Sequence, residues 1–161
     1  MAKISLVPVS AELEPVYHQL AQAYEGEFSR LTRRKPQPDG RFLHDTQLGG
    51  SVQGYLLYQG NNPVGLSAVE HRQGEHRQTE HEIREFYVVP SCRGAQLGKW
   101  FAHALFDLAA GVWISKQISG ADAAVEFWRH TIDDYSHGAF EEAMVTDPYW
   151  GPVNQFRFRR P

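Results

Sequence analysis

A short stretch between a strand and a helix has the residue types that bind phosphate. Val88, Val89 and Pro90 end a predicted strand, and the chain then turns through residues 91–98. Apolar residues at helical spacing follow, namely Leu97, Trp100, Phe101, Ala104, Leu105 and Leu108. The first backbone N–H groups of a helix lack partners within it and carry partial positive charge. This stretch therefore predicts an anion site at the start of the helix.

Small and basic residues in the turn fit this interpretation. Gly94, Ala95 and Gly98 keep side chains away from the backbone, and Arg93 and Lys99 add positive charge for a phosphate. An ordinary strand-to-helix connection with a surface Arg and Lys explains these residues equally well. The longer string around the turn is more specific.

The string FYVVPSCRGAQLG resembles the acyl-CoA-binding motif of the GNAT superfamily of N-acetyltransferases, Gln/Arg-x-x-Gly-x-Gly/Ala after a strand ending in Val-x-Pro. Arg93, Gly98 and the strand ending match, whereas Gln96 stands where the pattern has its first glycine. Its side chain crowds the pyrophosphate unless the backbone there keeps a helical φ. We interpret this departure as weakening or shifting cofactor binding. With VEFWRHTIDDY, the string resembles a bacterial branch of predicted acetyltransferases with Phe-Trp in the late helix.

The resemblance implies that acetyl-CoA binds as co-substrate. The pantetheine arm would pair with backbone near Tyr87 and Val88, and the pyrophosphate would rest on the N–H groups of the turn. The cofactor-binding residues implied in this way are Tyr87, Val88, Arg93, Gly94, Ala95, Gln96, Leu97, Gly98, Lys99 and Trp128.

Transfer of an acetyl group from a thioester to an amine needs a proton acceptor, because an alkyl ammonium with a pKa of ~10.4 must lose a proton to attack. Glu85 is the candidate base, acting directly or through water. Glu82 is a second choice, since its side chain faces away from that of Glu85 in a regular strand. A structural or substrate-orienting role for Glu85 stays open.

The late helix departs from the family in a second way. Many members carry Asn-x-x-Ala-x-x-Phe/Leu-Tyr there, and the Tyr protonates the departing thiolate. Here Ala121 replaces the Asn and Trp128 replaces the Tyr. An indole N–H is not a practical acid, so Trp128 packs against the pantetheine or fills the core. Tyr135 is the candidate acid, with solvent as the alternative.

The resemblance implies an N-acetyltransferase that moves an acetyl group from acetyl-CoA to a primary amine of a small molecule or peptide by direct attack. The alternative is a catalytically inactive CoA-binding sensor or interaction module of the same fold, which the departures favour. Carboxylates at Glu25, Glu27 and Glu82 would favour a cationic acceptor if they line its site. A homodimer through Phe156 and Phe158 or a sheet edge is plausible.

Composition narrows the setting. A chain of 161 residues with 42% hydrophobic residues suits a single globular domain spanning residues 1–161. The net charge of −3 gives no support for nucleic-acid binding. Cys92 is the only cysteine, which excludes an intrachain disulfide and favours a reducing cytoplasmic location. No apolar run approaches membrane-spanning length, so we expect no membrane contact.

We expect no metal site from the spacing of the histidines. His71, His76 and His81 flank a polar run, but they lack the i, i+4 or Cys-paired spacing of zinc motifs. Exposed histidines of a hairpin explain them better.

The periodicity predicts elements in an α/β (α+β) order. We expect strands at residues 3–9, 52–58, 64–72, 81–89, 112–119, 140–145 and 155–158. Helices are expected at 14–31 (one helix, or two kinked near Gly26), 97–108 and 121–135, while residues 42–50 are not assigned. This order is that of the GNAT fold. The resemblance implies a mixed, mostly antiparallel sheet of six to seven strands, about four helices and a splayed parallel strand pair at the cofactor site.

Overall fold

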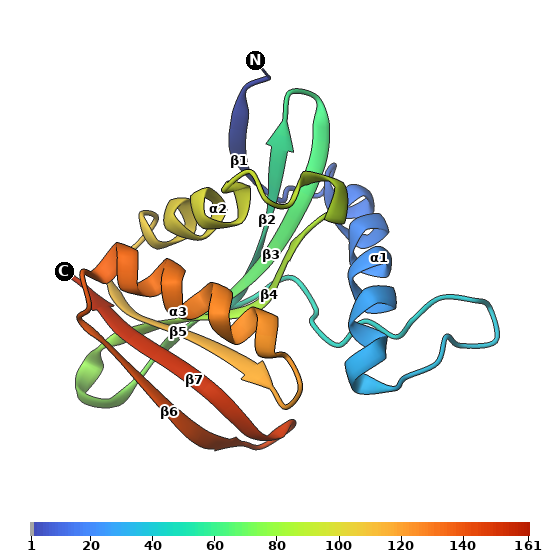
Figure 1. The fold of residues 1–161 in the computed structure, drawn as a ribbon. Helices are drawn as coiled ribbons and strands as arrows, with labels where there is room; N and C mark the ends of the chain where they lie inside the picture. The colour runs from blue at the N-terminus through green and yellow to red at the C-terminus, as the bar shows by residue number, and fades with distance from the viewer. Residues whose placement is uncertain (1) are drawn as a thin grey trace. The chain divides into compact units, whose positions relative to one another are not determined.

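A computed structural model describes residues 2–161 and shows the predicted alternation of strands and helices (Figure 1). The elements are β1 (Ile4–Pro8), α1 (Glu14–Thr32), β2 (Val52–Gln59), β3 (Asn62–Gln73), β4 (Thr79–Val88), α2 (Leu97–Phe106), β5 (Gly111–Ile118), α3 (Asp122–Ser136), β6 (Phe140–Asp147) and β7 (Gly151–Arg160). Short 3-10 turns lie at Glu75–Arg77 and Pro90–Cys92. The described strands form one 7-stranded sheet in the order β1-β2-β3-β4-β5-β7-β6.

The strand directions confirm a mixed sheet. β4 and β5 are parallel, with a register that runs from Glu80 opposite Val112 to Ile83 opposite Ser115. β1 pairs antiparallel with β2, and β7 pairs antiparallel with both β5 and β6. β4 continues past this parallel register to Val88. The turn that follows, residues 91–96 ahead of α2, carries the acyl-CoA-binding pattern and is called the motif loop below.

The first helix corrects one expectation. α1 is a single helix of 19 residues, so the alternative of two helices kinked near Gly26 is wrong. It begins at Glu14 as predicted, because Pro15 in the first turn needs no hydrogen-bond partner. It ends where Arg33 turns left-handed and its N–H donates to the Ser29 carbonyl at 2.7 Å. The part of the chain that the structure describes thus has three α-helices rather than four, none long and apolar enough to span a membrane.

The last strand is longer than its apolar pattern indicates. β7 begins at Gly151, while the predicted strand covers only residues 155–158. Its apolar and charged residues alternate between two faces, because Phe156 and Phe158 are buried and Arg159 is exposed. α3 packs on this strand and on β5 (Figure 1).

The chain divides into two compact units. The first comprises the chain up to Val69 together with Glu85–Gly98, and the second comprises Glu70–Arg84 with Lys99–Pro161. A core cluster in the first unit consists of Tyr17, Ala21, Leu56, Leu66, Ala68 and Tyr87. An aromatic core fills the second unit, in which the Phe106 ring lies 5.3 Å from Trp113 and 4.8 Å from Phe158 between ring centroids.

A polar residue lies on the most buried row of α1. The apolar stripe of α1, which includes Val16, Leu20 and Tyr24, is only partly buried. The adjacent row carries Tyr17, Ala21 and Glu25, which follow one another at the four-residue spacing of one helix face. Tyr17 and Ala21 are fully buried, and Glu25 is only 5% exposed. The helix therefore directs a carboxylate into the interior of the first unit.

Candidate functional site

Glu85, the candidate base, lies in a buried cluster of polar side chains. It is 4% exposed, and the Tyr17 hydroxyl donates to its Oε1 at 2.6 Å. The His44 Nε2 atom lies 2.7 Å from Glu85 Oε2 and 3.0 Å from Oε1. The Ser67 hydroxyl donates to the Glu85 backbone carbonyl at 2.6 Å. α1, β3, β4 and the segment between α1 and β2 therefore meet at one carboxylate.

The segment that carries His44 has no regular structure, yet it is anchored to α1. The Gln22 side chain donates to the Phe42 carbonyl at 3.0 Å and accepts from the Phe42 N–H at 2.8 Å. This reciprocal pair fixes the backbone two residues before His44. The imidazole packs edge-to-face against His18, with 5.9 Å between ring centroids, and its side chain is 11% exposed. Long-range contacts thus place the imidazole against Glu85.

Glu25 completes the cluster without a partner of its own. Its carboxylate forms no hydrogen bond or ion pair with any residue that the structure describes. One oxygen of Glu25, one oxygen of Glu85 and one imidazole nitrogen of His44 lie within 4.8 Å of one another. Burial, followed by the negative charge of Glu85, raises the pKa of Glu25 to about 7. The cluster can therefore hold a proton or a cation near neutral pH.

Burial and the charge of Glu85 also change the pKa values of His44 and Tyr17. Burial alone would lower the pKa of His44, but the hydrogen bond and the charge of Glu85 outweigh it and raise that pKa. Burial and the charge of Glu85 raise the pKa of Tyr17 far above its usual value. Tyr17 therefore stays a neutral donor to the carboxylate, and the raised pKa makes the His44 imidazole a stronger base than usual.

Sequence reasoning did not find Tyr17 or His44. Tyr17 lies next to the apolar stripe of α1, where an aromatic residue reads as core. His44 lies in residues 42–50, which show neither helical nor strand periodicity. A contact between residues 41 apart in the chain leaves no local pattern, so no signal in the sequence points to the pair.

The motif loop has two residues in the left-handed region. Gly94 has a φ of +88°, and a Cβ built there would meet nothing within 4 Å. Gln96 has a φ of 64° immediately before α2. The alternative in which Gln96 keeps a helical φ is therefore wrong. The backbone keeps the conformation that favours glycine, and the sequence places a side chain on it.

Arg93 braces this loop instead of presenting a free charge. Its guanidinium forms two hydrogen bonds with the Glu27 carboxylate, at 2.8 and 2.9 Å, and its Nε donates to the Val88 carbonyl at 2.9 Å. It also lies 5.6 Å from the centroid of the Tyr87 ring. The loop, the end of β4 and α1 are tied together by this side chain. The charge of Glu27 is consequently neutralised, unlike that of Glu25.

Three further predicted site residues lie in the second unit, each with a structural partner. The Lys99 ammonium lies 2.7 Å from the Asp134 carboxylate. Trp128 is 5% exposed and packs among aromatic rings, as the core alternative expects. The Tyr135 hydroxyl donates to Asp107 at 2.7 Å, and burial, followed by this hydrogen bond, raises its pKa. A raised pKa makes Tyr135 a weaker proton donor.

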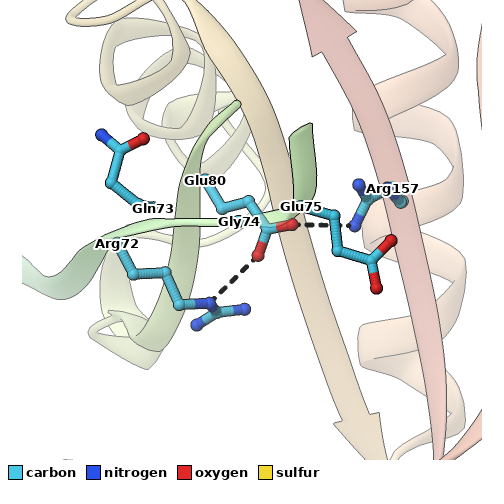
Figure 2. Close-up of a pocket in the computed structure, with 6 residues that line it drawn as sticks. All are labelled: Arg72, Gln73, Gly74, Glu75, Glu80 and Arg157. Carbon is cyan, nitrogen blue, oxygen red and sulfur yellow. Dashed lines mark hydrogen bonds and ion pairs between the residues drawn. The ribbon is translucent and has the colours of Figure 1, made fainter. Parts of the chain in front are cut away.

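A hollow of the second unit is lined by paired charges. The lining residues are Arg72, Gln73, Gly74, Glu75, Glu80 and Arg157. Figure 2 shows Glu80 between the guanidinium groups of Arg72 and Arg157, at 3.0 and 3.4 Å. Glu82, the second-choice base, lies 2.9 Å from Arg72 and 3.6 Å from Lys116. These carboxylates are held in ion pairs.

The histidines of the β3–β4 connection behave differently from one another. His76 is exposed, as expected, but His81 is only 3% exposed, so the expectation of an exposed side chain is wrong for it. His81 Nε2 lies 2.8 Å from the Ala110 carbonyl, and its Nδ1 lies 2.6 Å from His71 Nδ1. Because a carbonyl only accepts, His81 donates from Nε2 and accepts from His71 when both rings are neutral.

A comparison with protein families identifies the class of protein. The model described as the acetyltransferase (GNAT) family matches residues 13–148. The chain therefore belongs to the GNAT family of acetyltransferases, as the motif loop indicates. No curated protein matches the chain.

Solved structures show the same fold at low sequence identity. An acetyltransferase from Thermus thermophilus is 16% identical with a TM-score of 0.69, over 99% of this chain and 100% of that one. The ribosomal-protein-S18-alanine N-acetyltransferase from Escherichia coli is 13% identical, with a TM-score of 0.63 over 98% and 94%. Arabidopsis thaliana Naa50, in complex with the bisubstrate analogue CoA-Ac-MVNAL, is 14% identical, with a TM-score of 0.60 over 98% and 99%. These similarities confirm the predicted fold.

Proposed function

We propose that this protein transfers an acetyl group from acetyl-CoA to a primary amine of a small molecule or peptide. Membership of an acetyltransferase family supports the reaction class. The neighbour that binds CoA-Ac-MVNAL supports CoA as the acetyl carrier and an amine as the acceptor. The observation that carries the proposal is the buried pair of Glu85 and His44, because the attacking amine needs a proton acceptor.

Direct attack requires one bond to form and one to break. The amine nitrogen adds to the thioester carbon, the C–S bond breaks, and the amine proton moves to the Glu85–His44 pair. The thiolate then takes a proton from solvent or from Tyr135. No covalent intermediate on the protein is needed, which fits a site whose polar groups are two carboxylates, an imidazole and a phenol.

Two atoms of the pair can accept the proton. One is Glu85 Oε2, which lies 2.7 Å from His44 Nε2. The other is His44 Nδ1, which carries the lone pair when Nε2–H donates to the carboxylate. The Nδ1 atom has no hydrogen-bond partner among residues 2–161. In the second case Glu85 fixes the tautomer and orientation of the imidazole.

The motif loop supports the binding of acetyl-CoA through its backbone. Gly94 leaves open space over the turn, Arg93 holds the turn on β4, and Leu97 starts α2 directly after it. Anions bind such a helix start through its unpaired N–H groups. The Gln96 side chain is the element that works against tight binding.

Calorimetric titration with acetyl-CoA tests the cofactor half of the proposal. We expect binding that Ala95→Glu weakens at least about tenfold, because it adds a negative charge where the pyrophosphate rests. Ala11→Glu makes the same charge change at an exposed position of the first unit and should leave the affinity unchanged. Equal affinities in the two variants would rule out the motif loop as the phosphate site.

Release of free CoA thiol over a panel of primary amines tests the catalytic half. We expect turnover in the wild type, lost in Glu85→Gln and reduced in Tyr135→Phe. Turnover that survives in both variants would contradict the assigned roles. Tight acetyl-CoA binding with no turnover for any amine would favour the catalytically inactive CoA-binding module.

A further inference from the structure

We propose that Glu25, His44 and Glu85 form a binding site for one divalent transition-metal ion. The three residues come from α1, from the segment after α1 and from β4, and all belong to the first unit. Their spacing in the sequence has no metal-binding pattern. The site arises only where the fold brings the three side chains together.

The geometry leaves room for an ion between the three groups. Three atoms no more than 4.8 Å apart share a point that lies at most about 2.8 Å from each of them. Zinc–nitrogen and zinc–oxygen distances are ~2.0–2.2 Å, so shifts of several tenths of an ångström in the side chains close the site. Two carboxylates and one imidazole leave further coordination positions for water or a ligand.

The unpartnered state of Glu25 is the independent indication of a ligand. A glutamate residue that is 95% buried normally has its carboxylate paired with a cation or several donors, since an isolated buried charge is costly. Glu27, two residues further on, has such a pair with Arg93. Glu25 has none among the described residues, and its carboxylate faces His44 and Glu85. A bound cation would supply the missing partner.

Charge and ligand type favour a metal ion over an ammonium group. Two carboxylates balance the two positive charges of the ion, so the loaded cluster is neutral, as a buried site requires. An imidazole nitrogen is a good ligand for zinc, copper, nickel or iron. An ammonium group offers an imidazole no comparable bond, and it is repelled when the ring is protonated.

Neighbouring contacts hold the ligands in place. The Tyr17 hydroxyl binds Glu85 Oε1 at 2.6 Å, and a bound ion would take the place of the proton that His44 Nε2 shares with Oε2, 2.7 Å away. The pair between Gln22 and Phe42 fixes the backbone that carries His44. Such outer contacts orient metal ligands in proteins.

The metal site does not rest on the proposed acetyl transfer, because its test measures binding. If both proposals hold, the ion occupies the groups that accept the amine proton. It then acts as an inhibitor of transfer and is displaced by chelator.

Calorimetric and thermal-shift titrations with ZnCl₂ on the full chain test the site. We expect uptake of one Zn²⁺ per chain and a rise in Tm. Glu25→Gln and His44→Gln should each weaken binding by roughly 100-fold. Glu14→Gln changes an exposed carboxylate of the same helix, and His71→Gln removes one member of the second unit's histidine pair. Both control variants should bind as the wild type does.

Three results would overturn the proposal. These are no zinc uptake by the wild type, uptake kept in both Glu25→Gln and His44→Gln, or uptake lost in His71→Gln. Binding of propylammonium in place of zinc at the same residues would also overturn it. Glu25→Gln removes an unpaired buried charge, so it should keep the far-UV circular dichroism of the wild type and remain a valid test.

Discussion

The two compact units treat their buried carboxylates in opposite ways. In the second unit, Glu80 and Glu82 each lie beside arginine side chains, and Asp147 lies 3.1 Å from the Lys116 ammonium. In the first unit, Glu85 has one imidazole and one hydroxyl, and Glu25 has no partner within residues 2–161. The carboxylates of the second unit are compensated by cations, whereas those of the first unit are compensated only in part, through His44.

This difference separates a structural network from a candidate site. A compensated network keeps each carboxylate ionised and in place, which stabilises the meeting point of several strands. An uncompensated buried carboxylate lowers stability and raises its own pKa, a combination that occurs mostly at functional sites. This difference supports our proposal that the functional site is the cluster around Glu85 rather than the hollow in Figure 2.

The largest expected effect separates two buried glutamates of the same strand. Glu85→Gln should lower kcat/KM for acetyl transfer at least about 100-fold, because the pair loses its proton acceptor or the group that orients the imidazole. Glu82→Gln should keep kcat/KM within about threefold but reduce the free energy of unfolding by about 1 to 3 kcal/mol, since it weakens contacts with Arg72 and Lys116. Steady-state kinetics and urea denaturation measure both. Equal losses of activity in the two variants would remove the distinction between the clusters.

The second expected effect concerns stability and pH at Glu25. Its pKa of about 7 in the folded protein exceeds the ordinary value of 4.5. The folded protein favours the protonated form of Glu25. The stability that Glu25 contributes is therefore fully present below about pH 4.5, and it is lost as the pH rises through about 7 and the buried carboxylate ionises. Glu25→Gln should be more stable than the wild type above pH 7, by on the order of 2 to 3 kcal/mol, with little difference at pH 4. Urea denaturation across this range tests it, and a stability gain that does not vary with pH would contradict the assigned titration.

The third expected effect concerns Asp147 in the second unit, whose contribution to stability changes with pH in the opposite direction to that of Glu25. Burial alone would raise the pKa of Asp147, but the N–H groups of Trp150 and Tyr149 and the Lys116 ammonium hold it below its usual range. The stability that Asp147 contributes is therefore present above about pH 4, near its unfolded pKa, and is lost as the pH falls through its folded pKa. Asp147→Asn should cost about 1 kcal/mol at pH 7. In the same denaturation series, this difference should shrink in acid.

The sequence predicts the order of strands and helices, but it does not predict which buried carboxylates have cationic partners. The alternation of strands and helices follows from local periodicity, and the motif loop follows from the resemblance to the GNAT pattern. The loop conformation at Gln96 is not predictable, because the surrounding fold imposes the positive φ.

The contacts of Arg93, His44 and Glu25 are not predicted either, because they involve residues distant in the chain. Arg93 has the residue type of a phosphate ligand, but Glu27, 66 residues away, takes its charge. His44 lies in a segment without periodicity, and Glu25 lies one position beyond the apolar stripe at Tyr24. Which carboxylate finds a cation depends on tertiary contacts that composition and spacing do not encode.

The smallest expected effect is that of Arg157→Gln, which tests whether the charge of Glu80 is balanced by more than one arginine. Glu80 keeps Arg72 at 3.0 Å when the weaker contact with Arg157, at 3.4 Å, is removed. Because the Arg157 side chain is 36% exposed, water replaces it at low cost, and Arg157→Gln should lower the free energy of unfolding by about 0.5 kcal/mol or less. Thermal denaturation at low and high salt measures this effect, which should vanish in high salt because exposed ion pairs are screened. A loss as large as that of Glu82→Gln would mean that each cation is indispensable. The carboxylates of the second unit would then depend on each single partner, as Glu85 does. Charge compensation would no longer distinguish a structural network from a functional site.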